Sequence, residues 1–140
     1  MGDRRQAREL ALQALFFFDM DKSDPDQDKN LVIFCAGNEE KLTQEVKPFF
    51  LDLVNGVREN SSQIDAFLNK YSKNWRISRM PVVDRNIMRI AIFEFIKHSD
   101  IPSSVTINEA VEIGKKYGTR DSGSFINGVL DRIKILEGFE

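Results

Sequence analysis

Three arginines close to the start of the chain, Arg4, Arg5 and Arg8, carry its clearest chemical signal. On a helix their side chains spread over about 100° of one face, beside an apolar stripe. Guanidinium groups suit phosphate, because they bond it bidentately and add to the positive end of a helix dipole. Leu12 and Phe16 continue this outer face, where an exposed aromatic ring can stack on an unpaired base. The pattern indicates binding of single-stranded RNA.

A structural interpretation of the same residues stays open. Arg5 and Glu9 are four positions apart, a spacing at which a helix forms ion pairs on its own surface. Phe16 would then pack against another helix instead of stacking on RNA.

A second polar cluster lies near the other end of the chain, between two amphipathic patterns. Thr106 followed by Glu109 has the spacing of a capping box, which predicts that a helix starts there. Gly118 is expected to end this helix through a positive φ. The next helix opens around Ser122, and its first turn points free N–H groups at the residues before it. We call residues 118–125, with the sequence GTRDSGSF, the joint.

The joint holds several candidate contact residues, each with an ordinary structural alternative. Asp121 and Ser122 stand at the helix start, where Ser122 is either a cap or a ligand contact. Phe125 lies at the edge of the apolar stripe, so it either packs in the core or stacks on a base. Asn127 lies off the stripe and is either structural or binds RNA or protein. Gly128 is expected to allow close helix packing.

Nothing in the sequence marks an active site. The chain lacks a glycine-rich phosphate loop after a strand, an HExxH motif and a nucleophile elbow. His98 is the only histidine and Cys35 the only cysteine, which excludes imidazole triads, multi-histidine metal sites and an internal disulfide. We therefore expect a protein that is not an enzyme and that uses no metal and no cofactor.

The net charge of −2 is unevenly distributed along the chain. Residues 19–45 carry three lysines against eight acids, and most of these acids fall in the segment DMDKSDPDQDKN, which predicts a solvated loop. A basic surface elsewhere is compatible with this pattern, although a pI near 5.5 argues against bulk electrostatic binding to duplex. The sequence has no signal peptide and no membrane-spanning run, so we expect a cytoplasmic protein.

Helical periodicity along the whole chain predicts an all-α fold with about seven helices, which must position the candidate residues. The first helix, from about Arg4 to Met20 and capped by Asp3, has a core stripe of Ala7, Leu10, Ala11, Ala14, Leu15 and Phe18. The last buries Ile126, Val129, Leu130, Ile133 and Leu136. The other helices are expected over about 28–36, 42–58, 62–71, 81–98 and 107–117, with Pro48 either kinking the third or setting its start.

The length of 140 residues favours one domain. A polar stretch around Trp75 suggests a boundary between an N-terminal helical subdomain, residues 1–73, and a C-terminal one, residues 80–140. The helix after Pro81 is apolar around its whole circumference and should be the buried centre. Within it, Glu94 needs a polar partner. Asp84, in its first turn, either complements the helix dipole or contacts RNA or protein.

Four segments together resemble the NusB family of transcription antitermination factors. They are RRQARELALQALF at 4–16, PFFLDLVNGV at 48–57, VVDRNIMRIAIFE at 82–94 and INEAVEIGKKYGTRDSGSFINGVLD at 107–131. The resemblance covers essentially the whole chain, and the last segment is its most specific part. It implies an all-helical fold of two subdomains. In this chain, Gln6 stands where many family members have a basic residue, and Phe16 replaces a frequent tyrosine.

The resemblance also implies partners and contact residues. A family member binds the boxA element of single-stranded leader RNA together with NusE, a small-subunit ribosomal protein. The complex joins RNA polymerase and promotes processive transcription of ribosomal RNA operons. The RNA contacts implied by position are Arg4, Arg5, Arg8, Phe16, Asp121, Ser122 and Phe125, with Asp84 and Asn127 as further contacts to RNA or protein.

Two alternatives to this function remain at the level of sequence. NusB-like helical modules also act with RNA-modifying enzymes, as fusions in front of RNA cytosine methyltransferases. A homodimeric interaction protein is the other alternative, with Leu12 and Phe16 in the contact between the two copies.

Overall fold

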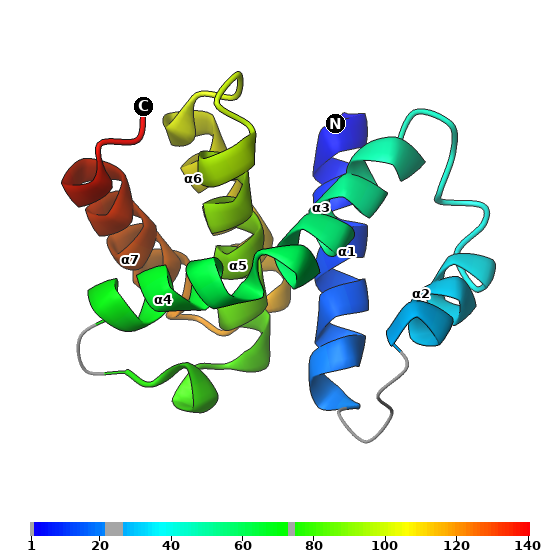
Figure 1. Cartoon of the computed structure of the whole chain (residues 1–140), viewed down its shortest axis with the longest axis horizontal. Coiled ribbons are helices and arrows are strands. Elements are labelled where there is room, and N and C mark those ends of the chain that lie inside the picture. The colour runs from blue at the N-terminus through cyan, green and yellow to red at the C-terminus, as the bar shows by residue number, and fades with distance from the viewer. Residues whose placement is uncertain (1, 22–26, 73–74) are drawn as a thin grey trace.

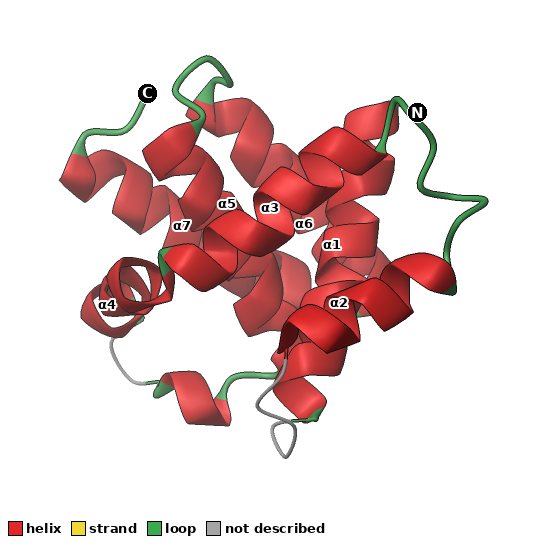
Figure 2. Cartoon of the chain, turned by 45° about the vertical axis from the view of Figure 1, so that its right-hand side comes forward, coloured by secondary structure: helices red, strands yellow, loops and turns green. Residues whose placement is uncertain are grey.

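Seven α-helices make up most of the structure, a computed structural model that describes residues 2–21, 27–72 and 75–140. No strand occurs in these ranges (Figure 2), so the all-α prediction is confirmed. The centre of the predicted acidic loop, residues 22–26, lies outside them. The helices are α1 (Asp3–Met20), α2 (Gln27–Ala36), α3 (Lys47–Glu59), α4 (Ser61–Tyr71), α5 (Val82–Lys97), α6 (Ser103–Tyr117) and α7 (Ser122–Glu137), with a short 3-10 turn, η1 (Ile77–Arg79), before α5.

Helix α5 is the centre of the bundle, as its apolar circumference predicts. It lies between α1 and α3 on one side and α6 and α7 on the other, and it also packs on α4 (Figure 1). One cluster of buried apolar side chains contains residues from every helix except α2 and η1, which only pack against it. The core is therefore continuous, and a division near residues 73–80 stays a prediction.

Helix α1 buries a wider arc than its predicted stripe. All six predicted core residues are buried, which confirms the stripe. Leu12 is only 2% exposed, so its predicted place on the outer face is wrong. The reason is that α1 packs mainly against two helices, α3 and α5, instead of one. An arc facing two partners includes positions that a single stripe leaves outside.

Two helix starts are set by proline. Pro48 lies in the first turn of α3, which begins at Lys47 and not at residue 42. Helix α6 begins at Ser103, directly after Pro102, so the prediction that Thr106 caps this helix is wrong. Thr106 is instead buried inside the helix and donates a hydrogen bond from its hydroxyl to Glu94 at 3.1 Å. Glu109, freed from a capping role, faces α1.

The last helix follows its predicted stripe until its final turn. Ile126, Val129, Leu130 and Ile133 are buried, but Leu136 is 63% exposed, against the prediction. In this turn it is Glu137 that faces α4, where it accepts hydrogen bonds from Lys70 and Tyr71. Leu136 consequently points outward.

Gly118 does end α6, but with a φ of −95° instead of the predicted positive value. Gly128 has no atom within 4 Å of an added Cβ, so its predicted role in close packing is wrong. In the described part of the chain, no helix has both the length and the apolar character needed to cross a membrane.

Candidate nucleic-acid interface

Arg5 is held by a carboxylate from α6. Its Nε donates to Glu109 Oε1 at 2.6 Å, and its Nη2 donates to Glu109 Oε2 at 2.7 Å. The hydrogen bonds from Arg5 hold the pKa of the Glu109 carboxyl below its usual range, and the pKa of Arg5 is raised in return. The alternative pairing of Arg5 with Glu9 is wrong. About a quarter of the Arg5 side chain stays exposed, so it remains accessible to a ligand.

Arg8 lies in the core, where it neutralises Glu94. Its side chain is 5% exposed, and Nε and Nη2 each donate to a Glu94 oxygen at 2.8 Å. Its Nη1 also reaches Glu109 at 3.4 Å. The expectation that Glu94 needs a partner is confirmed, and the expectation that Arg8 shares an exposed face with Arg4 is wrong. Arg8 follows the buried arc of α1, because it stands one turn before Leu12.

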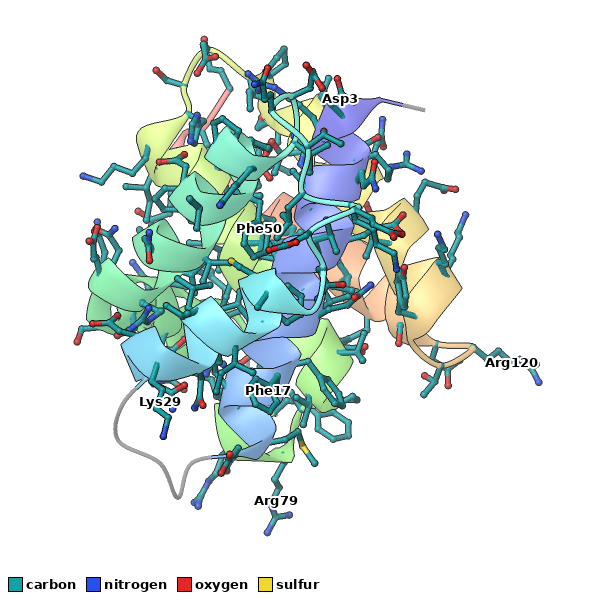
Figure 3. The ribbon with its side chains drawn as sticks, turned by 90° about the vertical axis from the view of Figure 1, so that its right-hand side faces the viewer. Asp3, Phe17, Lys29, Phe50, Arg79 and Arg120 are labelled. Atoms are coloured by element: carbon teal, nitrogen blue, oxygen red, sulfur yellow. The ribbon has the colours of Figure 1, made fainter. Side chains whose placement is uncertain are left out.

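Arg4 and Phe16 are the exposed members of the candidate set on α1. The Arg4 guanidinium lies over the ring of Phe49, 4.6 Å from its centroid, on the exposed surface of the helix. Phe16 is 38% exposed and the neighbouring Phe17 is 37% exposed. Figure 3 shows Phe17 near the end of α1 that lies away from Asp3. Basic and aromatic side chains are therefore spread along the helix, not gathered at one point.

Polar side chains bridge α1 and α6 beyond Arg5. Lys116 Nζ and the Tyr117 hydroxyl donate to the same oxygen of Glu9, at 2.9 Å and 2.7 Å. Burial raises the pKa of Glu9, but these hydrogen bonds outweigh it and leave the pKa below its usual range. The bridges border a hollow of about 470 Å³, which we call the α1–α6 hollow. Its lining residues are Gly2, Arg5, Gln6, Glu9, Leu10, Gln13, Lys41, Lys116 and Tyr117.

The joint is fastened to the start of α5 through Ser122. This residue is fully buried, its hydroxyl accepts the backbone N–H of Thr119 at 2.9 Å, and it donates to Asp84 Oδ1 at 2.7 Å. Ser122 is not the cap of α7, because Asp121 holds that position without a side-chain cap. Gly118 is required by this contact, since an added Cβ would lie 2.3 Å from the Ser122 hydroxyl oxygen.

Asp84 is buried to 98%, so it does more than complement a helix dipole. Burial raises the pKa of its carboxyl, and the hydrogen bond from Ser122 opposes this only in part. Neither Ser122 nor Asp84 is accessible enough to contact a ligand without a local rearrangement. Their geometry makes them positioning residues for the joint.

An aromatic hollow of about 270 Å³ lies beside the joint, lined by Trp75, Pro81, Asp84, Thr119, Asp121 and Phe125. Phe125 is half-buried, and its ring meets that of Trp75 edge to face, with centroids 6.2 Å apart and planes at 69°. Trp75 is 51% exposed. Two aromatic rings with open surface are suited to stacking on bases. Phe125 thus belongs partly to the core and partly to a surface.

The remaining candidates are exposed. Asp121 and Asn127 lie on the surface at the start of α7. Figure 3 shows Arg120 extending from the loop between α6 and α7, away from the rest of the protein.

Sequence reasoning missed four of the residues gathered here. Trp75 was seen only as part of a polar boundary, and Lys41, Lys116 and Tyr117 were not singled out. The aromatic ring in a polar stretch was the available signal for Trp75. Lys116 and Tyr117 meet α1 through their hydrogen bonds to Glu9, and Lys41 joins them from the turn between α2 and α3, so only the tertiary structure brings the three together. The need of Glu94 for a partner was predictable, because it is a charge inside an apolar pattern, but nothing in the local pattern identified Arg8 as that partner.

Comparisons with known proteins agree on one family. The model of the NusB family matches residues 5–134. A relative from Desulforapulum autotrophicum, called transcription antitermination protein NusB, is 59% identical over 140 residues, which cover 100% of this chain and 96% of the relative. A protein of the same name from Myxococcus xanthus is 40% identical over 135 residues, covering 96% of each chain.

Solved structures show the same likeness in three dimensions. NusB of T. maritima superposes with a TM-score of 0.84 at 37% identity, over 95% of this chain and 90% of that chain. A crystal structure of the antitermination factors NusB and NusE in complex with dsRNA contains a chain with a TM-score of 0.82 at 25% identity, over 97% of this chain and 98% of that one.

Proposed function

Because the chain belongs to the NusB family, we propose that it is a transcription antitermination factor that binds a boxA element in single-stranded leader RNA. It acts together with the ribosomal protein NusE, as the NusB and NusE complex with RNA suggests. The assembly joins RNA polymerase and promotes processive transcription of ribosomal RNA operons.

The observation that carries the proposal is the continuity between the two candidate regions. Helix α6 bonds to α1 at Glu109 and again at Lys116 and Tyr117, and the joint follows directly. A strand that contacts the start of α1 therefore meets polar side chains all along α6 before it reaches the aromatic hollow. Its unpaired bases find exposed aromatic surface at Phe16, Trp75 and Phe125.

The burial of the candidates divides their proposed roles. Arg4, Arg5, Phe16, Asp121 and Phe125 are accessible and contact RNA directly. Arg8, Asp84 and Ser122 act from below the surface: Arg8 ties α1 to α5, and the other two fix the joint. Asn127, exposed on α7, is a further contact to RNA or to the protein partner.

Quantitative RNA binding tests the proposal. Filter binding would compare a boxA-like single-stranded RNA with a scrambled RNA of equal length, each with and without the ribosomal protein. We expect tighter binding to the boxA-like RNA and a further gain when the partner is present. Equal binding of both RNAs under all four conditions would contradict the proposal.

A homodimer is the alternative that the same experiment must separate. Leu12 is buried and is not available for such a contact, while Phe16 remains exposed. Light scattering over a range of concentrations gives the oligomeric state. If a dimer forms and RNA dissociates it, the two interactions share a surface.

A further inference from the structure

We infer that the α1–α6 hollow holds a backbone phosphate of the bound RNA, clamped by Arg5, Lys41 and Lys116. The inference rests on the proposed RNA-binding function and adds a defined phosphate subsite to it. Lys41 and Lys116 are far from the arginine cluster in sequence, and neither belongs to the contacts that the family resemblance implies.

The convergence of cations from three segments supports this site. Arg5 comes from the first turn of α1, Lys41 from the turn between α2 and α3, and Lys116 from the last turn of α6. Within the lining, these three cations face a single carboxylate, that of Glu9. The amides of Gln6 and Gln13 add neutral donors. An anion is the ligand that matches this set of groups.

The carboxylates near the hollow accept hydrogen bonds from the cations without using all their donors. Arg5 donates hydrogen bonds from Nε and Nη2 to Glu109, so its Nη1 group remains available to a ligand. Lys116 donates one of its three N–H groups to Glu9. Hydrogen bonding to Glu9 raises the pKa of Lys116, so the amine stays charged. A phosphate oxygen can therefore bind without displacing either glutamate.

The aromatic hollow, at the other end of the proposed path, suits a phosphate poorly because carboxylates line it. Two carboxylates, Asp84 and Asp121, line the aromatic hollow, and the described residues of its lining include no lysine or arginine. A strand lying along α6 is thus expected to place a phosphate in the α1–α6 hollow and a base against Trp75 and Phe125. In this arrangement the RNA backbone faces the protein at the α1–α6 hollow, and a base faces it at the aromatic hollow.

Substitutions that remove one positive charge, each with a matched control, test the clamp. Lys116→Gln and Lys41→Gln are each expected to weaken RNA binding by about threefold to tenfold at low salt, and to reduce the slope of log K against log salt by about 0.7. Lys115→Gln and Lys47→Gln also remove exposed charges, but outside the hollow, and should change the slope far less. Equal effects in the two pairs would overturn the clamp.

A further variant separates loss of the clamp from loss of the ion pair with Glu9. Glu9→Gln leaves Lys116 in place and removes the one acid among the described residues of the hollow, so RNA binding should stay equal or become tighter. If Glu9→Gln weakens binding as much as Lys116→Gln does, the ion pair and not the phosphate contact is responsible, and the clamp is refuted.

Inorganic phosphate distinguishes a site for RNA from a site for a free anion. In NMR titrations at constant ionic strength, RNA should shift the side-chain amide signals of Gln6 and Gln13, and excess phosphate should compete weakly. Shifts with phosphate but not with RNA would overturn the RNA assignment. If the unaltered protein binds no boxA-like RNA, the proposed function fails; if it binds and all four lysine variants behave alike, only the clamp fails.

Discussion

The two ends of the proposed RNA path, the start of α1 and the joint, differ in the charge and type of their side chains. At the start of α1, cations predominate, and each glutamate there is bonded to a cation: Arg5 to Glu109, Arg8 to Glu94. At the joint, aromatic rings border two carboxylates, and the buried one accepts a hydrogen bond from a serine. The first end is built for phosphate and the second for bases.

This contrast shows that residue type alone does not separate recognition from support. Arg4 and Arg8 are one helical turn apart, yet one lies on the surface and the other is buried with Glu94. Asp121 and Ser122 are neighbours with the same difference. In each region an exposed polar residue lies close in sequence to a buried one that holds the backbone in place.

The largest effect is expected from Arg8→Ala. Removal of Arg8 leaves the buried Glu94 carboxylate without its cation, so the free energy of unfolding should fall by about 3–5 kcal/mol. Arg4→Ala, on the exposed face, should change it by less than about 0.5 kcal/mol. Urea denaturation measures both. Similar losses in the two variants would remove the distinction between supporting and contacting arginines.

Two glycine variants test the fastening of the joint. Gly118→Ala places a Cβ against Ser122 and the carbonyl of Gly114, and should destabilise the protein by about 1–3 kcal/mol. Gly128→Ala, in an open part of α7, should stabilise it by about 0.5–1 kcal/mol. Thermal unfolding distinguishes the two signs. A tolerated Gly118→Ala would mean that the joint is not tightly packed on Ser122.

Aromatic and basic variants should differ in their salt dependence. Trp75→Ala and Phe125→Ala are expected to weaken RNA binding by about 1–3 kcal/mol for each stacked base while the salt slope stays unchanged. Arg4→Ala should weaken binding less and reduce the slope by about 0.7. The slope is measured by filter binding at several salt concentrations between about 50 and 200 mM. A reduced slope in Trp75→Ala would contradict a purely stacking role.

The smallest effect concerns pH, where the two ends should show opposite signs. The folded state lowers the pKa of Glu109, so the stability it contributes is present above about pH 4.5 and is lost as the pH falls. Burial raises the pKa of Asp84, so the folded state loses stability as the pH rises above about 3.8. The unfolding free energies of the protein and of its Glu109→Gln and Asp84→Asn variants are measured from about pH 3 to 6 in steps of about one unit. The difference between the protein and one variant should then change with pH in the direction opposite to the difference for the other variant. Parallel changes would contradict the assigned environments.

Local sequence patterns determined the helices of this protein. The spacing of apolar residues predicted seven helices, the core stripe of α1 and the buried centre at α5, because helical periodicity depends only on residues a few positions apart. Helix starts were less accurate, as α6 shows, since Pro102 and Thr106 are both acceptable starts by local rules.

Only the tertiary structure decided which polar residues support the surface and which lie on it. Arg8 can be buried because it pairs with Glu94, 86 residues away in the sequence. Ser122 can be buried because it donates a hydrogen bond to Asp84, 38 residues away. The α1–α6 hollow likewise exists only where α6 lies beside α1. The sequence by itself determined an all-α protein with basic and polar ends, whereas the roles of those ends depend on long-range pairing, since a charge is stable in the core only beside a partner that no local pattern reveals.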